Sequence, residues 1–231
     1  MQMKVDVVSH VISHVISLGC NCHTAMFLKT LHLKQYSCPF DWVCLKLPAT
    51  IDILNSHFEK YIDPQYLIDH EDGDPRRCAH SIYGGRVFHH HNPRNPDHHA
   101  YFERCISRFC NVQGTRLYLH QAFYDRVSVD QVNDLHKALS YYSTDFVLVV
   151  INYYLDSETA HTKYNVALNT DGIVIVNAHT IGNQNGVAFT DRRDAEGLAQ
   201  FLFEHFTFDL RLNETEAVNE DRLYACDLCI P

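Results

Sequence analysis

Apolar residues recur with two different periods along the chain, and this change of period divides it into strands and helices. Residues 11–18 form an apolar run typical of a buried strand, and residues 22–31 place apolar side chains at helical spacing. Asn21 is a residue type that caps helix N-termini. The first part of the chain therefore predicts a strand that leads through a short turn into a helix.

The alternation continues through most of the chain. The patterns indicate helices at residues 48–62, 97–112, 128–142 and 191–206, and strands at residues 115–123 and 145–154. Residues 163–179 have the pattern of a hairpin that turns at Thr170-Asp171-Gly172. Strands that alternate with helices favour an α/β fold. We expect a mostly parallel sheet flanked by helices, with a late antiparallel hairpin.

Two segments interrupt this pattern. Residues 63–96 are rich in Pro, Gly, Asp, Arg and His, and only one short strand, "GGRVFHHH", is recognisable among them. A long irregular segment within a compact domain is often functional. Residues 213–231 form an acidic tail. We expect a single domain over residues 1–231, with an insertion at about 63–96 and this C-terminal tail.

Composition narrows the function classes. The 231 residues carry a formal net charge of −9, which argues against a general nucleic-acid binder. No apolar run approaches the roughly 18 residues of a membrane-spanning helix, so no membrane partner is expected. Nine scattered cysteines are typical of reduced thiols rather than of a disulfide framework, which predicts a cytoplasmic location.

The turn between the first strand and the first helix contains two thiols. Cys22 is expected at the start of the helix, where the helix dipole and free backbone N–H groups favour a thiolate and can hold an oxyanion. Cys20 is expected in the turn itself, and His23 on the helix surface. The alternative is that both thiols are small buried residues.

A histidine-rich stretch, "FHHHNPRNPDHH", offers candidate bases or metal ligands. His89 or His90 can serve as a general base at the end of a short strand. His89 and His91 would share one side of that strand and His90 the other. Alternatively, several of these histidines bind a divalent metal, or the stretch is a solvated polar loop.

Asp41 adjoins the chain's one tryptophan in the stretch "CPFDW". It can orient a histidine, as the third member of a catalytic triad does, or it can cap the local turn.

Cys226 and Cys229, near the C-terminus, have a spacing that zinc ligands use, but no second clear pair accompanies them.

Two separated motifs resemble the opening signature of a family known as putative papain-like cysteine peptidases, found in bacteria and large DNA viruses. That signature has a Ser-Leu-Gly strand end, a cysteine, an alanine three residues later, a leucine-rich helix and then Pro-Phe-Asp-Trp. The matching residues here are Ser17, Leu18, Gly19, Cys22, Ala25, Leu28, Pro39, Phe40, Asp41 and Trp42. "VFHHHNP" and the Arg-Phe of "CISRFC" are similar to later parts of the family pattern, and the resemblance ends near Val112.

The resemblance implies Cys22 as nucleophile and one of His89–His91, preferably His90, as its base. It also implies an α+β papain-like fold, as an alternative to the α/β sheet that the apolar pattern predicts. The function expected is a cysteine-dependent hydrolase or peptidase with a protein or peptide substrate and with no cofactor and no metal. The alternatives are a metal-dependent hydrolase built on the histidines with Asp97 or Asp41, and a non-enzymatic viral interaction protein in the host cytosol.

Overall fold

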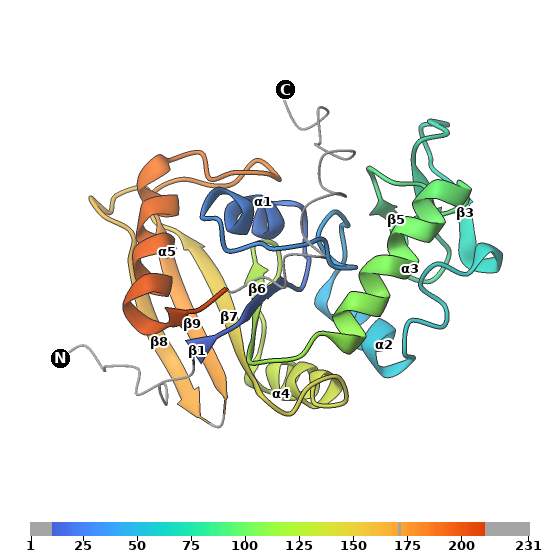
Figure 1. The fold of residues 1–231 in the computed structure, drawn as a ribbon. Helices are drawn as coiled ribbons and strands as arrows, with labels where there is room; N and C mark the ends of the chain where they lie inside the picture. The colour runs from blue at the N-terminus through green and yellow to red at the C-terminus, as the bar shows by residue number, and fades with distance from the viewer. Residues whose placement is uncertain (1–10, 171, 211–231) are drawn as a thin grey trace.

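A five-stranded sheet forms the centre of the protein in the computed structural model, which describes residues 11–170 and 172–210 (Figure 1). In spatial order its strands are β2 (His14–Ser17), β6 (Arg116–Ala122), β7 (Phe146–Leu155), β9 (Ile173–Thr180) and β8 (Lys163–Thr170). The first four strands run parallel, and β8 pairs antiparallel with β9. The α/β sheet with a late hairpin is therefore confirmed, although Asp171 of the hairpin turn lies outside the described residues.

Helices cover both faces of this sheet. They are α1 (His23–Thr30), α2 (Leu47–Asn55), α3 (Pro96–Asn111), α4 (Val129–Leu139) and α5 (Arg192–His205). Alternate residues of β7 join two separate cores, with Val149 facing the side of α5 and Val150 facing the side of α2, α3 and α4. A strand buried on both faces explains the unbroken apolar run that the sequence shows there.

The first strand is divided, which the apolar run did not predict. β1 (Val11–Ile12) pairs in parallel with β10 (Thr207–Phe208), whereas β2 pairs with β6. The chain changes partner at Ser13, where the N–H groups of Ser13 and His14 both donate to the carbonyl of Thr115. An apolar pattern records burial but not the partner strand, so it cannot show such a division.

The insertion contains more regular structure than expected. A short 3-10 helix (Pro64–Tyr66) leads into an antiparallel sheet of β3 (Leu67–Asp69), β4 (Cys78–His80) and β5 (Gly84–Phe88). Strands of three residues are too short to show a period. This sheet and α3 lie on the opposite side of the molecule from α5 (Figure 1).

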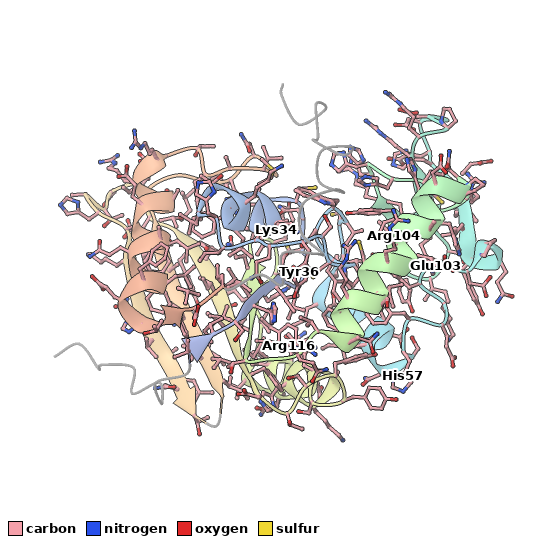
Figure 2. The ribbon with its side chains drawn as sticks, viewed as in Figure 1. Lys34, Tyr36, His57, Glu103, Arg104 and Arg116 are labelled. Atoms are coloured by element: carbon pink, nitrogen blue, oxygen red, sulfur yellow. The ribbon has the colours of Figure 1, made fainter. Side chains whose placement is uncertain are left out.

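The second helix is shorter than residues 48–62 because the backbone reverses after Asn55. His57 and Phe58 both have positive φ angles, 51° and 63°, which end the helical path. Buried Arg116 then links the sheet to α3, because its guanidinium donates to the carbonyl of Phe109, at 2.9 Å, and to that of Val112 (Figure 2). Within the described residues, no helix has the length and apolar character needed to span a bilayer.

Candidate active site

The turn after β2 is tight and lies against the Pro-Phe-Asp-Trp segment. Gly19 and Cys20 both adopt positive φ angles, 78° and 86°. A Cβ at position 19 would lie 3.3 Å from the carbonyl oxygen of Phe40, so only glycine fits without displacing that segment. The two motifs that are separated in the sequence therefore meet at this turn.

Cys22 occupies the N-cap position of α1, which begins at His23, one residue later than the sequence predicts. Its carbonyl accepts the N–H of Met26 at 3.0 Å, and its side chain is buried, with 8% exposure. The side chain of Asn21 accepts the N–H of His23 at 3.0 Å, so Asn21 provides the capping hydrogen bond. This geometry places the Cys22 thiol at the positive end of the helix.

Cys20 lies in the turn, and its surroundings favour the neutral thiol. Burial raises the pKa of Cys20 to about 11, although the backbone N–H groups of Phe123 and Tyr124 donate to its sulfur and favour the thiolate. At neutral pH Cys20 therefore stays protonated, which makes it a poor nucleophile.

His23 is not on the helix surface, which corrects the expectation from the sequence. Its side chain is only 1% exposed, with ring centroids of Phe123 and Phe189 at 4.7 and 4.5 Å. Burial lowers the pKa of His23 to about 4, so the ring is neutral at physiological pH. The aromatic neighbours come from loops more than 90 residues away, so the helical pattern alone could not show this burial.

His89 and His90 directly follow β5. Their ring centroids are 5.2 Å apart, and that of His89 is 5.9 Å from the ring of His70. Burial, with the nearby charges of His89 and Arg77, lowers the pKa of His90 to about 4. Burial and neighbouring cations also lower the pKa of His89. Both rings are therefore neutral at pH 7 and able to accept a proton.

His70 is a histidine that the sequence did not single out. Its Nδ1 lies 2.7 Å from Asp72 Oδ1, and the other oxygen of Asp72 accepts from Arg77 at 2.6 Å. This carboxylate fixes the ring of His70 beside His89. The alternating acids and histidine of "DHED" were the available signal, but nothing in the sequence placed them next to β5.

The remaining histidines of the rich stretch support the local fold. The ring of His91 stacks on Tyr101 at 5.0 Å, and His98 Nδ1 accepts the N–H of Asn92 at 3.0 Å. Across residues 11–170 and 172–210, no group of three or more His, Cys, Asp or Glu side chains is arranged to hold a metal ion. The described residues thus give no ligand set for the metal-dependent alternative, and Cys226 and Cys229 lie outside them.

Asp41 is buried beside a cation. Its carboxylate lies 2.7 Å from Lys34 Nζ and accepts the N–H of Cys38 at 2.6 Å. The Asp41 N–H in turn donates to the Cys38 carbonyl, so this residue closes the turn, as one of the two sequence readings predicts. Lys34 and Tyr36 lie between α1 and α3 in Figure 2.

Cys44 contacts β5 and lies near Cys20 in the turn after β2. Its N–H donates to the carbonyl of Val87 in β5 at 3.2 Å, and its thiol is close enough to Cys20 to raise the pKa of that residue. Arg86 lowers the pKa values of both Cys44 and His89 through its charge. Cys44 therefore contacts β5 through its backbone and lies within electrostatic range of Cys20 in the turn after β2.

Comparison with protein families places most of the chain in a family. Residues 13–166 match the model of a family described as "putative papain-like cysteine peptidase". The chain belongs to this family. The family match continues past Val112, where the motif resemblance ends, and reaches β8. No curated protein and no solved structure matches the chain.

The segments that carry the peptidase family's pattern converge in the structure. Arg108 donates to the carbonyl of Ser37 at 3.1 Å, and the ring of Phe109 packs edge-on against Phe40 at 5.8 Å. Phe40 also lies against Gly19, next to the cysteine turn. The turn before α1, the Pro-Phe-Asp-Trp segment and the Arg-Phe pair thus form one packed unit in this chain.

Proposed function

We propose that the chain is a thiol hydrolase of peptide or related acyl bonds, with Cys22 as nucleophile and His90 as its base. The observation that supports this most is the position of Cys22 at the N-terminus of α1, after the short turn that follows β2 of the parallel sheet. Functional groups in such sheets gather at the carboxyl ends of the strands. Membership of a family described as cysteine peptidases supports the same chemistry.

The resting protein holds a neutral imidazole at position 90, because burial keeps the pKa of His90 near 4. On attack, the Cys22 sulfur bonds to the substrate carbonyl carbon while His90 accepts the thiol proton. Backbone N–H groups at the start of α1 stabilise the oxyanion. The amine leaves with the proton from His90, and water then hydrolyses the thioester. His89 is the second candidate for this base.

Asp41 has a positioning role in this proposal. Its ion pair with Lys34 and its hydrogen bond with Cys38 hold the turn that precedes Trp42. That turn contacts Gly19 through Phe40. We infer that Asp41 keeps the cysteine turn in place and does not itself exchange protons.

Alkylation by iodoacetamide at pH 7 tests the nucleophile. Labelling at Cys22, located by peptide mass analysis, is expected to be at least about tenfold faster than at Cys20, whose raised pKa keeps it protonated. Cys22→Ala should remove the fast phase, whereas Cys20→Ala should leave it unchanged. Equal slow labelling of wild type and Cys22→Ala would contradict an activated Cys22 and would favour a non-enzymatic role.

The base is tested by comparing His90→Gln with His89→Gln. If His90 accepts the proton of Cys22, His90→Gln should slow the alkylation of Cys22 about tenfold or more at pH 7, because general-base assistance is lost. His89→Gln is the matched control, because His89 is the adjacent residue and also follows β5 directly. A larger loss in His89→Gln would assign the base to His89 instead.

A further inference from the structure

A two-part cleft opens at the carboxyl ends of β6, β7 and β9. The larger part has a volume of about 500 Å³ and is lined by Phe123, Tyr124 and residues 183–186. The smaller part, about 160 Å³, shares Phe123, Asn183 and Gln184 with it. Among the residues that the structure describes, no charged side chain lines either part. The cleft therefore suits a neutral ligand rather than an ionic one.

One wall of the smaller part is aromatic. The rings of Phe123 and Tyr153 stack with centroids 4.4 Å apart, and the ring of Phe189 lies 5.9 and 5.6 Å from them. Leu155 and Tyr124, at the rim of the cleft, are 61% and 62% exposed, which is high for large apolar side chains. Thr180, Gly182, Asn183 and Gln184 line the rest of this part. An aromatic wall beside polar groups suits one large apolar side chain whose backbone stays at the polar side.

The larger part presents amide donors. The side-chain oxygen of Asn183 accepts the N–H of Gln184, and that of Asn185 accepts the N–H groups of Val187 and Ala188. Within the described part of the chain, the side-chain Nδ2 groups of Asn183 and Asn185 donate to no protein acceptor. These exposed donors are suited to carbonyl oxygens, which a peptide backbone supplies.

The wall that carries these donors is held in place by a buried carboxylate. Asp194, in the first turn of α5, accepts the N–H groups of Ile181 and Gly182 at 2.9 and 2.8 Å. The carbonyl of Asn183 accepts both the N–H and the hydroxyl of Thr190. A fixed loop loses little conformational freedom on binding, which favours recognition of a ligand.

Asn21, which precedes the candidate nucleophile Cys22 in the chain, contacts the wall of the cleft. The side-chain amide of Asn21 donates to the Tyr124 hydroxyl and to Gln184 Oε1, both at 3.2 Å. Asn21 thus links the helix start at Cys22 to the cleft wall. A ligand in the cleft lies beside the turn that positions Cys22.

We propose that this cleft binds an extended, uncharged peptide segment, whose large apolar side chain enters the pocket of Phe123, Tyr153 and Phe189 and whose carbonyls accept from Asn183 and Asn185. This inference rests on the proposed function and names its substrate class. The bound segment would flank the peptide bond that Cys22 attacks.

The test is a titration of the full chain carrying Cys22→Ala, so that binding is measured without thiol chemistry. The probes are the blocked peptides acetyl-Gly-Phe-Gly-amide and acetyl-Gly-Asp-Gly-amide, followed by chemical shifts of backbone amides. The Phe peptide is expected to bind at least about tenfold more tightly and to shift resonances of residues 183–189. Equal binding of both peptides, or shifts confined to other regions, would overturn the proposal.

The donors are tested by Asn183→Asp combined with Asn185→Asp. Each change keeps the oxygen that holds the loop and replaces the donor with a second acceptor, so binding of the Phe peptide should weaken about tenfold or more. Asn95→Asp, which keeps the N-cap of α3 and adds a charge outside the cleft, should bind as before. Unchanged binding in the double variant, or binding of cellobiose in place of the peptide, would contradict the assignment.

The two proposals fail separately. Peptide binding in the Cys22→Ala protein, together with slow alkylation of Cys22 in the wild type, would support the peptide-binding cleft and contradict the proposed hydrolase activity. Rapid alkylation of Cys22 without selective binding of the Phe peptide would support Cys22 as the nucleophile and contradict the proposal that the cleft binds the peptide.

Discussion

Between pH 7.5 and pH 5, His23 and His120 together are expected to remove about 4 kcal/mol from the free energy of unfolding. Both side chains are at most 2% exposed, and burial lowers both pKa values from 6.5 to about 4. Between these two pH values the unfolded chain binds protons that the folded protein does not. Stability is therefore complete above pH 6.5 and falls as the pH drops toward 4, by about 2 kcal/mol per histidine at pH 5.

Such a loss is a large part of the 5–15 kcal/mol that is usual for a protein of this kind. Urea unfolding at pH 7.5, 6 and 5 measures it. The matched variant is His23→Leu, which places an apolar side chain of similar size between Phe123 and Phe189 and cannot take up a proton. Its stability should vary with pH by about 2 kcal/mol less than that of the wild type. Parallel pH profiles would show that the folded protein accommodates the charged ring of His23.

The burial of His23 also shows where sequence reasoning reaches its limit. The helical period correctly placed a helix after Asn21, because local apolar spacing and a capping residue depend only on neighbours in the chain. The ring of His23 is buried by Phe123, which follows β6, and by Phe189, from the loop between β9 and α5. No local pattern contains that information.

The same distinction applies to the site. The position of Cys22 at a helix start could be predicted, because the apolar pattern indicated both the strand before it and the helix after it. The approach of Phe40 to Gly19 could not be derived from spacing, although the glycine was a signal that something lies close. The cleft had a weaker signal in the Asn- and Gly-rich residues 183–186, because the carboxyl ends of parallel strands meet at one edge of the sheet.

Removal of the Asp41 carboxylate is expected to cost about 3–5 kcal/mol of stability, which is typical when one partner of a buried ion pair is deleted. The side chains of Lys34 and Asp41 are 5% and 2% exposed. In Asp41→Ala the buried ammonium of Lys34 loses this carboxylate, and the N–H of Cys38 loses its acceptor. Urea unfolding of Asp41→Ala at pH 7.5 measures the effect. A loss below about 1 kcal/mol would show that water reaches Lys34.

Two further variants separate the contributions of Asp41. Asp41→Asn keeps an oxygen for the N–H of Cys38 but removes the charge, so its loss should be smaller than that of Asp41→Ala. Adding Lys34→Met to Asp41→Ala removes the buried cation and should restore part of the stability.

The alkylation rate of Cys22 shows whether Asp41 only holds the turn or also orients the base. If Asp41 only holds the turn beside Gly19, the folded Asp41→Asn protein should label at nearly the wild-type rate. If Asp41 orients the base, labelling should slow as much as in His90→Gln, because the proton acceptor would then be misplaced whether or not the turn is intact.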